Sequence, residues 1–183
     1  LLIKNEIEKI RQRDSQFASN TQITDTEMAE CLGIFIGGNG DYNDSSMGMS
    51  PELYQRLKQL NQNDLKLNIF KLILKDLDLP SMEHGIPSQL IASRWEVRLA
   101  LLGGFIAANG SWDEGDNEYE LVHSNESLAR SVVSIVRSLG LQAHLYYHVT
   151  SFGHFSVRIS GDSLNELAQF ICIERKRSKN STD

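Results

Sequence analysis

Two nine-residue segments of the chain repeat each other. Segments Leu32–Gly40 and Leu102–Gly110 agree at six of nine positions, and both end in asparagine followed by glycine. Their spacing is a constant 70 residues, as from Asn39 to Asn109. Similarity at a fixed period is typical of a tandem duplication. We therefore expect two copies of one structural unit, each built around an equivalent helix.

Helix-start signals precede both segments. Thr24–Glu27 and Ser93–Glu96 each place a hydroxyl residue three positions before a glutamate, which is the pattern of a reciprocal capping box. We expect Thr24 and Ser93 to cap the two helices. For one segment alone, an ordinary apolar helix ending in an Asn-Gly turn is the simpler interpretation. Two copies in register favour equivalent helices instead.

Small residues recur one helical turn apart inside these helices. They are Gly33 and Gly37 in the first helix, and either Gly103 with Ala107 or Gly104 with Ala108 in the second. A glycine inside a helix costs roughly 0.5 to 1 kcal/mol relative to alanine, so repeated glycines at matching positions indicate a contact without space for side chains. We expect the two helices to pack closely at the centre of the protein.

Beyond the second segment the chain alternates between strand and helix patterns. A strand is expected over 119–125, a helix ended by Gly140 over 126–139, a hairpin over 142–149 and 154–160, and a last helix from Asp162. Inward positions of the hairpin are Ala143, Leu145, Tyr147, Val149, Phe155, Val157 and Ile159. The first half predicts helices over 51–60 and 65–77, joined only by 61–64. A matching hairpin is missing there, either through erosion or through residues absent from the chain.

Charge and cysteine content limit the classes of protein. A net charge of −6 and a pI near 5.4 argue against an avid, nonspecific nucleic-acid binder. Cys31 and Cys172 lie in apolar helical patterns, which predicts buried thiols in a reducing intracellular compartment, nucleus or cytoplasm. Apolar stretches are far shorter than the roughly 20 residues of a membrane span, so no membrane partner is expected. Because the chain begins at Leu1 without methionine, we expect a fragment.

The repeated helices carry a resemblance to a known family. Helices of this form, closing on an acidic residue and glycine and occurring twice per chain, are the signature of the LAGLIDADG homing endonucleases, which this chain resembles. Gly85–Leu90, Arg137–Leu141 and Cys172 with the basic run 175–177 resemble landmarks of the intein-borne members, in particular the subfamily of yeast vacuolar-ATPase inteins. The resemblance covers about residues 23–178.

This resemblance implies an α+β fold of two pseudo-symmetric αββαββα halves packed through their motif helices. The halves would span 23–92, shortened, and 93–178, with a flanking helix over 1–22 and a tail over 179–183. In the family, saddle-shaped sheets lie in the major groove of double-stranded DNA. The implied partners are therefore double-stranded DNA and a splicing domain in the same precursor, and the implied state is a monomer with internal two-fold symmetry.

The resemblance also implies where catalysis would take place. In the family, two aspartates at the motif helix ends hold Mg²⁺ beside the scissile phosphates, but Asn39 and Asn109 stand at those positions here. An amide brings no net charge and should hold a hard divalent ion weakly. His84 replaces an expected lysine, whereas Lys176 matches another. We expect cleavage to be lost and no Mg²⁺ cofactor in this version.

The hairpin offers candidate DNA-contacting side chains. Its outward positions are Gln142, His144, Tyr146, His148, His154, Ser156, Arg158 and Ser160, none of which is acidic. A two-stranded ribbon with such groups can enter the major groove. A solvated sheet face remains the alternative, and zinc binding by the three histidines is a remote one. Five carboxylates within 113–120 would repel phosphates, so retention of DNA binding stays open.

Two further functions fit the sequence. One is a noncatalytic nucleic-acid-binding protein, such as an intron maturase or a domesticated regulator. The other is an active endonuclease in which asparagines were introduced by engineering. Restoring aspartate at both positions should recover cleavage only in the engineered case.

Overall fold

The computed structural model describes residues 25–38, 70–75, 77, 85–149, 153–162 and 164–169. The expected flanking helix over 1–22, helix over 51–60, linker over 61–64 and tail over 179–183 lie outside these residues. The domain boundaries and the shortened first half therefore stay predictions. Within the expected helix over 65–77, residues 70–75 are helical.

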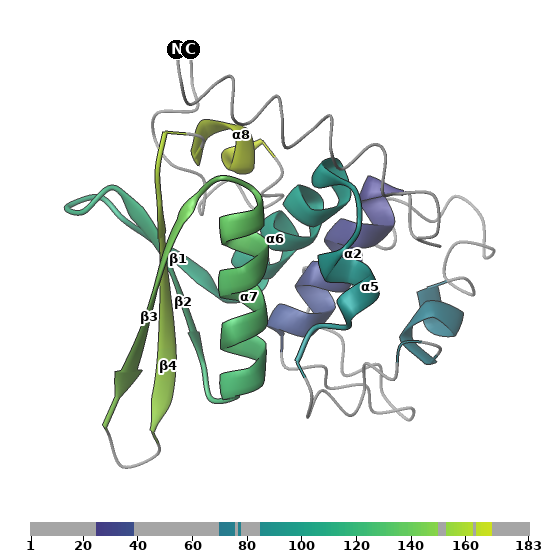
Figure 1. Ribbon diagram of the computed structural model, residues 1–183, viewed down its shortest axis with the longest axis horizontal. Coiled ribbons are helices and arrows are strands. Elements are labelled where there is room, and N and C mark those ends of the chain that lie inside the picture. Colours follow the sequence, from purple (N-terminus) through teal and green to yellow (C-terminus); the bar gives the residue numbers. More distant parts are fainter. Residues whose placement is uncertain are drawn as a thin grey trace.

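The described elements form an α+β fold (Figure 1). The helices are α2 (Thr26–Gly37), α5 (Ser88–Ile91), α6 (Trp95–Asn109), α7 (Glu126–Ser138) and α8 (Leu164–Ala168). The strands are β1 (Gly110–Asp113), β2 (Glu118–His123), β3 (Gln142–His148) and β4 (His154–Ser160). Both motif helices, the helix after β2 and the hairpin strands are confirmed. No helix among the described residues is both long and apolar enough to cross a lipid bilayer.

The four strands form one antiparallel sheet in the order β1-β2-β4-β3. One face packs against α7, which buries Leu128, Val132 and Val136 on a single stripe. Facing them are the fully or nearly fully buried strand residues Tyr119, Leu121, Val157 and Ile159. In Figure 1, α7, α6 and α2 follow one another on this side, and no described element covers the other side. We call that uncovered side the open face.

Helices α2 and α6 lie at the centre with their backbones almost in contact. A Cβ added to Gly33 would lie 2.0 Å from the Leu101 carbonyl oxygen, and a Cβ added to Gly104 would lie 2.1 Å from that of Glu30. Neither position can accept a side chain unless the helices move apart. The expected close packing of the two repeated helices is therefore confirmed.

The same contact decides between the two alternatives for the second helix. A Cβ on Gly37 would lie 3.0 Å from the Cβ of Ala108. Gly33 and Gly37 thus meet Gly104 and Ala108. Every residue of α2 from Met28 to Gly37 is buried, and all of them except Glu30 are apolar, as expected for a helix at the centre of a core.

The expected caps of the motif helices are wrong. Asp25, not Thr24, caps α2, because its carboxylate accepts hydrogen bonds from the backbone N–H groups of Glu27 and Met28. Arg94 occupies the cap position of α6 without a side-chain hydrogen bond. The Ser93 hydroxyl is buried and donates instead to the Leu90 carbonyl at 2.6 Å, closing the preceding turn.

Strand β1 was not predicted from the local sequence pattern, although the αββαββα order implied by the resemblance has two strands after each motif helix. It follows α6 directly and pairs with β2, with Trp112 opposite Tyr119 and Asp113 opposite Glu118. The connecting turn is stabilised by the Asp113 carboxylate, which accepts from the backbone N–H of Gly115 at 2.8 Å, and Asn117 adopts a positive φ of 54°. The acidic run over 113–120 is therefore a hairpin that belongs to the sheet.

Candidate nucleic-acid interface

Asn109 is the last residue of α6, and its side chain is tied to the sheet. Its amide nitrogen donates to the backbone carbonyl of Val122 in β2 at 2.5 Å. Gly110 then leaves the helix in extended conformation and starts β1. The amide therefore fixes the helix end against β2. Asn39, His84 and Lys176 lie outside the described residues, so the rest of the expected catalytic set stays a prediction.

The hairpin places its predicted outward residues on the open face. Gln142, His144 and Tyr146 of β3 are exposed. At the far end of the hairpin, His148 and His154 are cross-strand partners with stacked rings, 4.7 Å between centroids. These side chains carry donors, acceptors and flat rings of the kind that meet base edges and sugars. They form the part of the open face without a carboxylate.

Arg158 lies between this part and an acidic part of the same face. Its register partners are Glu120 in β2 and His144 in β3. The guanidinium lies 3.1 Å from Glu118, 3.5 Å from Asp116 and 3.7 Å from Glu120. Desolvation is the largest single effect and opposes its charge, but the surrounding acidic groups, led by Glu118 and Glu120, together raise the pKa of Arg158. The one basic candidate for DNA contact is thus surrounded by carboxylates.

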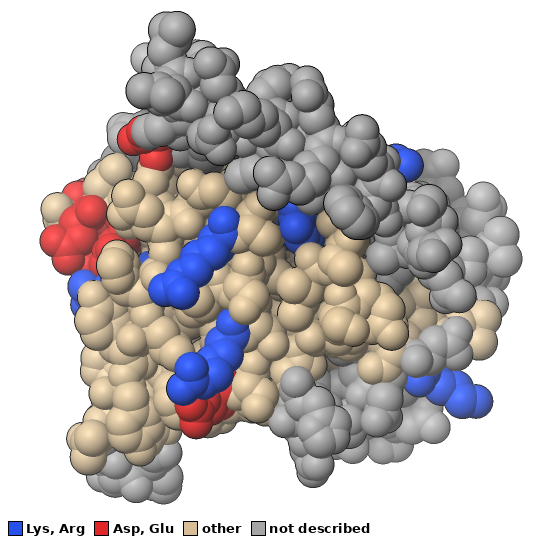
Figure 2. Space-filling view, viewed as in Figure 1, with Lys and Arg blue, Asp and Glu red and all other residues tan. Residues whose placement is uncertain are grey.

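The acidic part coincides with the β1–β2 hairpin. In Figure 2, acidic side chains gather at the edge of the molecule where that hairpin projects in Figure 1, whereas basic side chains are visible over α7. Because β2 pairs with β4, the carboxylates share the open face with the hairpin instead of lying apart from it. Phosphates are therefore repelled from the β1–β2 end and tolerated at the β3–β4 end.

Ser156 was predicted to contact DNA, but it is buried. It points to the open face but is 0% exposed, because β4 is an inner strand flanked by Val122 and Tyr146. Its hydroxyl donates to the Glu120 carboxylate. Ser156 therefore positions Glu120 next to Arg158 and is closed to a ligand.

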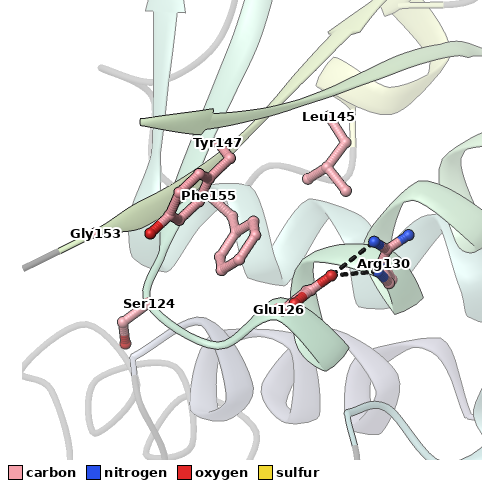
Figure 3. Close-up of a pocket in the computed structure, with 7 residues that line it drawn as sticks. All are labelled: Ser124, Glu126, Arg130, Leu145, Tyr147, Gly153 and Phe155. Atoms are coloured by element: carbon pink, nitrogen blue, oxygen red, sulfur yellow. Dashed lines mark hydrogen bonds and ion pairs between the residues drawn. The ribbon is translucent and has the colours of Figure 1, made fainter. Parts of the chain in front are cut away.

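Two residues predicted to point inward are largely exposed. Tyr147 is 59% exposed and Val149 is 87% exposed, because β3 ends at His148 and the helices do not cover this end of the hairpin. Tyr147 lies on the predicted helix-facing side, where it packs obliquely on Phe155 at 5.0 Å between ring centroids and borders a cavity of about 600 Å³ (Figure 3). A pair between Arg130 and Glu126 forms another wall, and the cavity is lined by Ser124, Glu126, Arg130, Leu145, Tyr147, Gly153 and Phe155.

The histidines do not assemble into a metal site within the described ranges. No group of three or more His, Cys, Asp or Glu side chains there could hold an ion. His123, which lies on the helix side of β2, has a structural role: its Nδ1 accepts from the backbone N–H of Asn125, and burial lowers the pKa of its imidazole. Cys31 is fully buried in α2, as predicted, and Cys172 lies outside the described residues.

A four-stranded antiparallel sheet with helices on one side and a polar open face on the other defines this part of the chain as an α+β domain. Comparison with known families gives a match to the homing endonuclease family over residues 85–179. This is more than half of the 183 residues, and the chain belongs to the homing endonuclease family. No curated protein matches the chain.

Proposed function

We propose that this chain is a homing-endonuclease-type, double-stranded DNA-binding domain that has lost DNA cleavage and is carried within an intein. Asn109 carries the proposal. It stands at the end of a motif helix, where the family resemblance implies a metal-binding aspartate, and its amide is engaged with the Val122 carbonyl. In this proposal the chain keeps the family's recognition of DNA and has lost DNA cleavage.

The residues at this helix end do not fit a divalent cation. Mg²⁺ prefers charged oxygen ligands held in octahedral geometry and gives up its water reluctantly. Asn109 offers one uncharged amide oxygen in place of a carboxylate, and its Nδ2 group is already hydrogen-bonded to the Val122 carbonyl of β2. No step of a reaction is therefore assigned to a metal in this chain.

The open face supports the DNA-binding part of the proposal. A two-stranded β-ribbon fits the major groove, where side chains reach distinct patterns of donors and acceptors. Gln142, His144 and Tyr146 are exposed on β3 and would face the base edges. Glu118 and Glu120, which flank Arg158, belong to β2, two strands away from β3, so DNA would contact the β3 side of the sheet.

The intein context rests on sequence landmarks. Gly85–Leu90 now has a structural role, because it leads through α5 into α6, and Ile86 donates its backbone N–H to the Ser131 hydroxyl of α7. Gly85 needs its positive φ of 80° and has no room for a Cβ against Ser127. These residues position the motif helix, while splicing is assigned to segments outside this domain.

Selection from a randomised duplex pool, followed by affinity and cleavage assays, tests the proposal. We expect a selected sequence to bind at least about a hundredfold more tightly than an unrelated duplex, with affinity falling as salt rises from about 50 to about 200 mM. Addition of Mg²⁺ should leave that DNA intact. Restoring aspartate with Asn39→Asp and Asn109→Asp together should also leave it intact.

Three outcomes would contradict parts of this account. Equal weak binding to every duplex would remove the DNA-binding function. A Mg²⁺-dependent double-strand break by the unaltered chain would show that cleavage is retained. Cleavage by the restored chain alone would show that the asparagines are the sole lesion in an otherwise active enzyme.

A further inference from the structure

The contact between α2 and α6 is reciprocal, and it therefore shows which residues of the two helices are counterparts. A Cβ on Gly33 would meet the Leu101 carbonyl oxygen and, at 2.9 Å, the Phe105 nitrogen. A Cβ on Gly104 would meet the Glu30 carbonyl oxygen and, at 3.0 Å, the nitrogen of residue 34. Adding 71 to a residue number in α2 gives its counterpart in α6. Gly33 then corresponds to Gly104, Glu30 to Leu101, and Ile34 to Phe105, so the two contacts are equivalent.

The third close approach obeys the same shift. Gly37 faces Ala108, and these two residues are also 71 positions apart. In a pair of helices related by two-fold symmetry, a residue next to the symmetry axis faces its own counterpart in the other helix, as Gly37 faces Ala108. The reciprocal contacts of Gly33 and Gly104 and the approach of Gly37 to Ala108 are two separate observations, and both give the same register.

This register differs by one residue from the best alignment of the repeated segments. The sequence identities give a spacing of 70, which pairs Asn39 with Asn109. The packing gives 71, which pairs Gly38 with Asn109. Gly38 ends α2: its backbone N–H donates to the Ile34 carbonyl at 2.9 Å. The first segment thus has one additional residue between the helix contact and its Asn-Gly pair.

We infer that Gly38, not Asn39, is the counterpart of Asn109, so the first motif helix presents no side-chain ligand at the position where the second presents an amide. This deepens the proposed function and rests on it only for the expectation that carboxylates at both helix ends would share a cation. This chain then differs from a metal-binding pair of aspartates at two positions. Asn109 carries an amide that is hydrogen-bonded to β2, and Gly38 has no side chain.

The inference predicts which pair of substitutions creates a cation site. Gly38 has φ −82° and ψ 15°, which any L-residue adopts, and a Cβ there would lie 3.2 Å from the Ile34 carbonyl oxygen, so only a small shift is needed. Asn109→Asp removes the donor to Val122 and frees a carboxylate from β2. Gly38→Asp with Asn109→Asp therefore places two carboxylates at matched helix ends.

The test compares Tb³⁺ binding, read by luminescence, in two double variants and one single variant. We expect Gly38→Asp/Asn109→Asp to bind at least about tenfold more tightly than Asn39→Asp/Asn109→Asp, because two charged oxygen ligands share one ion only in the first pair. The inference is overturned if the Asn39 pair binds as tightly, or if neither pair exceeds Asn109→Asp alone.

A second test uses cysteine variants in case the double aspartate variants do not fold. Gly38→Cys/Asn109→Cys should bind Cd²⁺ with a strong thiolate absorption above that of the unaltered chain, and Asn39→Cys/Asn109→Cys should not. The reverse order of the two pairs overturns the inference. Both cation assays are made without DNA, so failure of the DNA-binding proposal would not alter their result.

Discussion

Replacing Gly33 or Gly104 by alanine is expected to destabilise the protein by about 3 kcal/mol or more. Alanine inside a helix normally gains roughly 0.5 to 1 kcal/mol over glycine, so propensity alone predicts the opposite sign. Steric overlap decides, because the new Cβ would lie 2.0 or 2.1 Å from a backbone carbonyl oxygen where ordinary contact begins at 3.4 Å. The helices would have to separate along a fully buried interface.

Urea denaturation followed by circular dichroism measures this effect. Gly115→Ala is the matched control, since Gly115 lies in the exposed β1–β2 turn and its nearest neighbour is a side-chain oxygen of Asp113 at 3.3 Å. That control should change stability by no more than about 0.5 kcal/mol. Unchanged or increased stability of Gly33→Ala would show that the two backbones are not in contact.

Neutralising Glu118 and Glu120 together is expected to raise DNA affinity about tenfold or more at low salt. Both carboxylates lie within 4 Å of the Arg158 guanidinium, so their replacement by glutamine frees that charge for phosphate and removes two repelling charges. The gain should shrink as salt rises, because the free energy gained from counterion release falls and the screening of charges increases with ionic strength. Fluorescence anisotropy with one duplex at several salt concentrations provides the measurement.

A second pair of substitutions controls for net charge. Glu96→Gln with Glu126→Gln removes the same two charges from a net charge of −6, but both residues lie on exposed helix turns, Glu96 at the start of α6 and Glu126 at the start of α7. Its effect on affinity should be clearly smaller. Equal gains from both pairs would mean that DNA does not use the open face.

The central helix pair could be predicted because its cause is visible in the sequence. Glycines spaced one turn apart in two copies have few explanations other than close backbone approach, and Gly33 with Gly104 shows that approach. The amphipathic helix over 126–139 and the alternating hairpin were likewise predictable, since period and turn residues specify them locally. Gly140, with φ 79°, ends the helix as expected.

Other features depend on tertiary contacts that local patterns do not encode. Ser156 alternates as an outward residue, yet the order of the strands puts β4 inside the sheet and buries it. Ser93 fits a capping box, but its hydroxyl donates to the Leu90 carbonyl of the preceding turn, and Arg94 is the residue at the start of α6. Turn chemistry around Gly115 and Asn117 could have predicted β1, and with it the carboxylates beside Arg158, had the acidic run been interpreted as a hairpin.

Formation of a disulfide between cysteines at positions 37 and 108 most directly tests the claim that the two repeated helices meet at the centre. A Cβ on Gly37 would lie 3.0 Å from that of Ala108, whereas cysteines joined by a disulfide prefer about 3.8 Å, so a small separation of the backbones suffices. After mild oxidation of folded Gly37→Cys/Ala108→Cys, peptide mapping by mass spectrometry should find these residues joined. Persistently reduced thiols at both positions in the folded protein would contradict the account.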